Sequence, residues 1–156
     1  MLRVESAAKV GVSAVRSILE EIGSIQRNWW RGALGLDPFE EGRPAILSGK
    51  MALFHAHGIP DEEDVFMAFA DAAFILGRLA DWAKRFKIKW RVRMNDEDWG
   101  AVDPVGLTPP LREQMRKWAG RARVFENGPA SWSIPEERRE ALLSRYADRK
   151  EDRKEV

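Results

Sequence analysis

The chain has 156 residues, of which 44% are hydrophobic and 33% are charged, and this balance excludes a disordered chain. Its 26 basic and 25 acidic residues leave a formal net charge of +1, so a whole-molecule field that attracts nucleic acid is absent. The lack of cysteine excludes disulfides, thiolate catalysis and cysteine-based zinc sites. We expect one globular domain over 1–148 and a charged tail at 149–156 that frays.

The N-terminal sequence does not have the pattern of a targeting segment. Charges at Arg3, Glu5 and Lys9 interrupt it, so it contains no continuous apolar region of a signal peptide. No run of the sequence approaches the ~18 apolar residues that are needed to span a bilayer. These observations predict a cytoplasmic protein without a membrane partner.

Apolar residues recur at helical spacing through much of the chain. The clearest helix is the third, because Asp61 suits an N-cap and acidic residues follow it in the first turn. Thr108 and Pro109 are likewise typical of a helix start, with a hydroxyl cap followed by proline at the first helical position. The pattern predicts five helices, at 5–31, 44–57, 61–86, 109–123 and from Pro135 onward.

The most informative pattern is a strict alternation between Lys87 and Met94. Successive side chains of a strand point to opposite faces, so the alternation predicts one apolar and one fully basic face. The apolar residues are Ile88, Trp90, Val92 and Met94, and the basic residues are Lys87, Lys89, Arg91 and Arg93. A turn at 95–98 and a return strand from Trp99 to Val102 would complete an antiparallel hairpin over about 87–103.

These elements together predict an α+β fold. About five helices would surround the central helix 61–86, and the small antiparallel hairpin would cover one side. Because an isolated two-stranded hairpin is only marginally stable, we expect a third strand, with 130–134 as its candidate.

Two histidines, His55 and His57, are the first candidates for chemistry, because imidazoles two residues apart on a strand can share a metal ion. On the expected helix end they would not face each other, and the acidic residues that could supply a third ligand, 61–64, already have a role as helix caps. A metal-dependent hydrolase that uses both histidines is therefore the second alternative. We expect no metal, no cofactor and no enzymatic activity.

The basic strand face has three interpretations. Lysine and arginine can simply solvate a strand and protect it from aggregation. They can also recognise an acidic protein surface, where charge accelerates association. In the first functional alternative, the basic strand 87–93 and the helix 112–123 bind nucleic acid, but the interleaved aromatic residue Trp90 points away from the basic side.

We interpret the chain as a non-enzymatic protein-binding module. A small bacterial immunity or inhibitor protein, which neutralises a partner by occluding it, is one instance of this class. The expected partner is a protein with an acidic surface patch, and the expected binding residues are Lys87, Lys89, Arg91, Arg93 and Trp30. Trp30 is included because adjacent residues on a helix diverge by about 100°, so one of Trp29 and Trp30 tends toward the surface. There Trp30 can either contact a partner or cover the loop at 34–39, and the sequence favours neither.

Overall fold

A computed structural model describes residues 1–28, 34–53, 58–59, 61–128 and 131–133, with single positions at 137, 140 and 144. In chain order its elements are β1 (Leu2–Ser6), α1 (Val12–Asn28), β2 (Gly35–Leu36), β3 (Ser48–Met51), α2 (Glu62–Phe86), β4 (Trp90–Met94), β5 (Glu97–Asp103), β6 (Gly106–Leu107), α3 (Pro109–Ala122), β7 (Phe125–Gly128) and β8 (Ser131–Ser133). The last expected helix and the expected tail at 149–156 lie outside the described residues, apart from the three single positions.

The centre of the fold is a six-stranded antiparallel sheet with the order β2-β3-β1-β4-β5-β6. The prediction of five helices around a central helix with a small hairpin is therefore wrong. The described residues form three helices and this large sheet, which remains an α+β architecture. The hairpin β4–β5 is part of the sheet, and its neighbour is the N-terminal strand β1.

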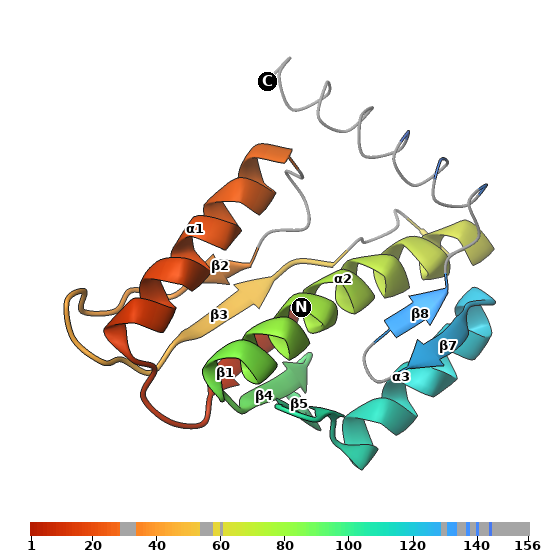
Figure 1. Ribbon diagram of the computed structural model, residues 1–156. Coiled ribbons are helices and arrows are strands. Elements are labelled where there is room, and N and C mark those ends of the chain that lie inside the picture. The colour runs from red at the N-terminus through yellow and green to blue at the C-terminus, as the bar shows by residue number, and fades with distance from the viewer. Residues whose placement is uncertain are drawn as a thin grey trace.

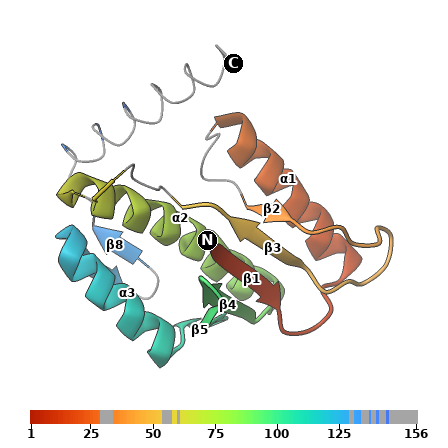
Figure 2. The same cartoon turned by 180° about the vertical axis from the view of Figure 1, so that it is seen from behind.

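The helices cover one face of the sheet. Figure 1 shows α1 and α2 in front of the strands, and Figure 2, from behind, shows β1 and β3 in front of α2. The apolar side chains of β1 and β4 point into this helical layer, where Val4, Trp90 and Val92 are at most 2% exposed. Burial of each such side chain stabilises the fold by roughly 1.5–3 kcal/mol before opposing terms. The core therefore lies between the sheet and the helices.

The predicted first helix over 5–31 is wrong at its start. Residues 2–6 form β1 instead, with Leu2 and Val4 buried and Arg3 and Glu5 exposed. The helix begins only at Val12, after Gly11. Strand β1 is short, but both of its edges are hydrogen-bonded, to β3 and to β4, so tertiary pairing decides its conformation.

The predicted second helix over 44–57 is also wrong. Residues 48–51 form β3, between β2 and β1, and residues 54–57 lie outside the described residues. Gly49 makes the close strand packing possible, because a Cβ there would lie 2.7 Å from the carbonyl oxygen of Gly35. Pro44 begins no helix, and the adjacent Ala45 instead forms a β-bridge with Val10.

The third helix is confirmed as α2. Asp61 accepts a hydrogen bond from the backbone nitrogen of Asp64, and the carboxylate of Asp64 accepts one from the backbone nitrogen of Asp61. This reciprocal capping box satisfies two backbone donors at the helix start. The helix ends at Phe86, and its C-cap Lys87 adopts the left-handed conformation with φ 57°. Lys87 is therefore a helix cap and not the first residue of a strand.

The hairpin turn is tighter than the predicted 95–98. Asn95 and Asp96 both have positive φ, which is the conformation of a two-residue type I′ turn, and Met94 pairs with Glu97. The return strand β5 therefore starts at Glu97. The predicted strand at 130–134 exists as β8, but it pairs with β7 in a separate two-stranded sheet. It is not the third strand of the hairpin.

Helix α3 starts where the Thr108-Pro109 pair predicts, with a different use of the threonine. The Thr108 hydroxyl makes no cap hydrogen bond to its own helix. It accepts a hydrogen bond from the backbone nitrogen of Ala101 at 2.9 Å, while the Thr108 backbone nitrogen donates to the Ala101 carbonyl. These two hydrogen bonds therefore hold the start of α3 next to β5.

Candidate functional site on the open face of the sheet

The alternation in β4 is confirmed. Trp90, Val92 and Met94 are buried beneath the helices, while Arg91 and Arg93 are exposed on the opposite side. We call this opposite side the open face, and its exposed charged residues on β1, β3 and β4 are Arg3, Glu5, Lys50, Arg91 and Arg93. The basic side chains predicted from β4 alone are thus part of a larger surface made by three adjacent strands.

Arg3 and Lys50 belong to this surface, and sequence reasoning missed both. In the observed register Lys50 lies opposite Arg3, and Arg3 lies opposite Arg93. For Arg3, the alternation of apolar and polar residues in Leu2–Ser6 indicates a strand. The helical pattern further along the chain concealed this signal. The pairing of β1 with β3 and β4 then brings together cations that are far apart in sequence.

The predicted site residues differ in their placement. Arg91 and Arg93 lie within β4 on the open face. Lys89 is exposed just before β4, where its carbonyl accepts a hydrogen bond from the backbone nitrogen of Ala7. Lys87 is exposed at the helix cap, outside the strand. Trp30 lies outside the described residues, as does its neighbour Trp29.

The open-face cations have few internal partners. A guanidinium nitrogen of Arg93 donates to the carbonyl oxygen of Asp96 at 3.0 Å, within the hairpin turn. In the part of the chain that the structure describes, no ion pair joins Arg3, Lys50 or Arg91 to a carboxylate. These side chains are therefore available to an external anion.

Arg85 contrasts with them, although it lies only two residues before Lys87 in the sequence. It pairs with Asp81 at 2.9 Å and with Glu21 at 2.9 Å. The Arg85 guanidinium donates hydrogen bonds to the carboxylates of Asp81 and Glu21, and these bonds raise the pKa of Arg85 above its ordinary value. This arginine joins α2 to α1 within the fold, so it is not part of the candidate site.

The basic helix 112–123 of the nucleic-acid alternative corresponds to α3 and its C-cap Arg123. This helix packs against β5 and α2, and it lies beside β5 at the end of the sheet in both views (Figures 1 and 2). Arg123 forms an ion pair with Glu62 at 2.7 Å, and Arg112 and Arg116 also have interactions of their own. Arg112, Arg116 and Arg123 therefore already have partners within the protein.

The histidine pair cannot be placed, because His55 and His57 lie outside the described residues. Two of the acidic residues considered as further ligands, Asp61 and Asp64, serve the capping box of α2. Among the described residues, no group of three His, Cys, Asp or Glu side chains is arranged to hold a metal ion.

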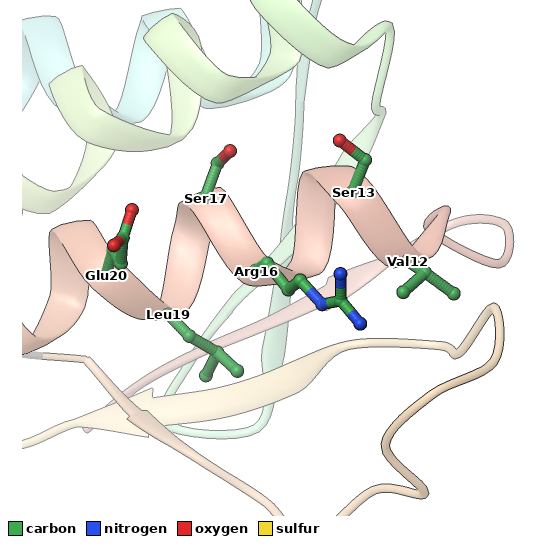
Figure 3. A pocket seen from close by; sticks show the side chains of 6 residues that line it. All are labelled: Val12, Ser13, Arg16, Ser17, Leu19 and Glu20. Atoms are coloured by element: carbon green, nitrogen blue, oxygen red, sulfur yellow. The ribbon is translucent and has the colours of Figure 1, made fainter.

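A further surface feature is a hollow beside the first half of α1 (Figure 3). Ser13, Ser17 and Glu20 lie on one side of the helix, and Val12 and Leu19 on the other. A serine needs a neighbouring base to act as a nucleophile. The described residues that line this hollow include no histidine or lysine, and the carboxylate of Glu20 is the one basic group on the side of the two serines.

Comparison of the chain with protein-family models, with curated proteins and with solved structures finds no match. Among the described helices, none is long and apolar enough to cross a membrane. The function of this chain therefore has to be inferred from the geometry of the open face.

Proposed function

We propose that this protein is a non-enzymatic binding module whose open face docks onto an acidic surface of another protein. The observation that carries the proposal is the exposure of Arg3, Lys50 and Arg91 without ion pairs among the described residues. A small bacterial immunity or inhibitor protein that occludes its partner is one instance. The cytoplasmic location and the absence of enzymatic activity stay predictions.

Electrostatics defines what such a surface can do. An exposed ion pair contributes only about 0.2–1 kcal/mol to binding, so affinity needs several pairs or additional contacts. Complementary charge has a larger effect on the association rate, which falls as salt screens the surface. We therefore expect fast, salt-sensitive association with a partner that presents several carboxylates.

Nucleic acid is the less favoured partner for two reasons. Single-stranded binding relies on aromatic side chains between the cations, whereas Trp90 is fully buried on the other side of β4. Acidic side chains among the cations, such as Glu5, oppose a continuous phosphate backbone as well.

The test is a charge reversal on the open face. The double variant Arg91→Glu/Arg93→Glu should lose most of a stoichiometric protein partner that the wild-type chain captures from native lysate. The matched control is Lys117→Glu/Arg121→Glu on α3, which makes the same charge change at two exposed positions and should keep the partner. Thermal denaturation of each variant checks that the fold is intact.

Two results would contradict the proposal. Equal capture by wild type and by the open-face variant would remove this face from the interface. Tight binding of a DNA or RNA duplex in a low-salt gel shift, weakened by both double variants, would favour the nucleic-acid alternative.

A further inference from the structure

Three cations stand in a row across the middle of the sheet. Lys50 on β3 pairs in register with Arg3 on β1, and Arg3 pairs with Arg93 on β4. All three side chains are exposed on the open face. We call these residues the cationic row. The row is perpendicular to the strands and ends at β5, where Asp98 lies opposite Arg93.

Such a row is unfavourable for the isolated fold. Like charges directly opposite each other on neighbouring strands destabilise a sheet. The neighbouring row is different, because Glu5 separates Ser48 from Arg91 and supplies the opposite charge. The cationic row has no carboxylate between its members, so an external anion would relieve repulsion that the fold itself leaves in place.

We propose that the cationic row binds the acidic face of an α-helix that lies across the strands. This inference rests on the proposed function and specifies the partner's chemistry. Neighbouring strands are about 4.8 Å apart, so the outer members of the row are about 9.6 Å apart at the backbone. Carboxylates at positions i, i+3 and i+7 of a helix share one face and span about 10.5 Å along its axis. Three carboxylates of a crossing helix therefore match three cations.

An extended acidic segment fits less well. Side chains on one face of a strand repeat about every 6.7 Å, so three of them span about 13 Å. A single nucleic-acid strand would gain nothing from stacking, because the members of the row are Lys50, Arg3 and Arg93 and none is aromatic. The spacing and chemistry both favour the helical occupant.

The test uses two synthetic peptides of about 20 residues with identical alanine-rich composition and equal helicity by circular dichroism. The first peptide carries glutamates at i, i+3 and i+7 in one stripe, and the second distributes them around the helix. Fluorescence anisotropy at roughly 20 mM salt measures their binding to the full chain. We expect the striped peptide to bind about tenfold more tightly, which corresponds to a difference of about 1.4 kcal/mol in binding free energy.

The variant Arg3→Gln/Lys50→Gln/Arg93→Gln should abolish this preference. Its matched control, Lys84→Gln/Lys117→Gln/Arg121→Gln, removes three exposed cations from α2 and α3 and should retain the preference. The row variant should remain folded, because removal of like charges should not lower its melting temperature. A lost peptide preference would therefore report on binding and not on unfolding. A thermal melt of both variants verifies this.

Equal affinity for the two peptides, or a preference that survives in the row variant, would overturn the inference. Tighter binding of a DNA duplex than of the striped peptide would also overturn it. The proposed function fails separately: if equal peptide affinities accompany loss of the native partner in Arg91→Glu/Arg93→Glu, the open face remains an interface and only the helical geometry is wrong.

Discussion

Gly100 is the residue at which the close contact between β5 and α3 depends most on the absence of a side chain. Its φ is +117°, a region that residues with a Cβ rarely adopt. A Cβ at this position would lie 2.7 Å from the Thr108 hydroxyl and 3.0 Å from the backbone nitrogen of Leu111. Backbone conformation and packing therefore require glycine at the same position.

We expect Gly100→Ala to lower the free energy of unfolding by about 2–5 kcal/mol, because strain and overpacking add. Urea denaturation measures the loss. The control is Gly120→Ala in α3, where a Cβ meets nothing within 4 Å. This change should stabilise the helix by roughly 0.5–1 kcal/mol. Similar stabilities for the two variants would show that Gly100 is not constrained as the structure indicates.

At the scale of elements, Glu21 joins α1 to α2. Its carboxylate accepts a hydrogen bond from the indole nitrogen of Trp82 at 2.9 Å and pairs with Arg85. Trp82 is fully buried, so its indole nitrogen depends on an acceptor from α1. Loss of that acceptor leaves a buried donor unpaired, which costs more than the loss of an exposed ion pair.

Glu21→Ala should therefore destabilise the protein by about 1–3 kcal/mol in chemical denaturation. Glu21→Gln keeps an oxygen acceptor for Trp82 and should retain most of the stability. Glu20→Ala, at the adjacent exposed position, should change stability by less than about 0.5 kcal/mol. If all three variants were equally stable, the hydrogen bond between the helices would have no structural role.

Repulsion within the cationic row lowers the stability of the fold at β1, and binding of an acidic partner would relieve that repulsion. Arg3→Thr removes the central charge of the row and introduces a residue that favours strands. We expect the free energy of unfolding to rise by roughly 0.2–1 kcal/mol while affinity for the striped acidic peptide falls. Paired measurements of denaturation and anisotropy test the two effects together. An increase in both stability and affinity would contradict a binding role for Arg3.

At the scale of the molecule, local signals could be predicted from the sequence and long-range pairing could not. Asp61 and its acidic neighbours predicted the start of α2, and the alternation from Ile88 to Met94 predicted the two faces of β4. These features depend on residues close in the chain. The position of β1 depends on partners that lie about 45 and about 90 residues away, and no local pattern specifies them.

In the candidate site, too, some residues could be predicted from local sequence and others depend on long-range strand pairing. Arg91 and Arg93 were predicted because one strand contains them. Arg3 and Lys50 join them only through the register of β3, β1 and β4. The strand that contains Lys50 was also hard to predict, because its neighbours Gly49 and Ser48 have no strong strand preference. They occupy β3 because β2 approaches this strand closely. The composition of a multi-strand surface therefore requires the topology.

The same topology makes the N-terminus structurally essential. β1 lies between β3 and β4, so deletion of residues 1–6 would remove hydrogen bonds from both and expose the core that Leu2 and Val4 cover. Chain ends ordinarily tolerate truncation, but only where their backbone is not paired. We expect the truncated chain to lose its cooperative thermal transition in circular dichroism. Two glycines added before Met1, which is 48% exposed, should leave the transition within about 5 °C of wild type. Cooperative unfolding of the truncated chain near the wild-type temperature would mean that β1 is dispensable and that the sheet can close without its central strand.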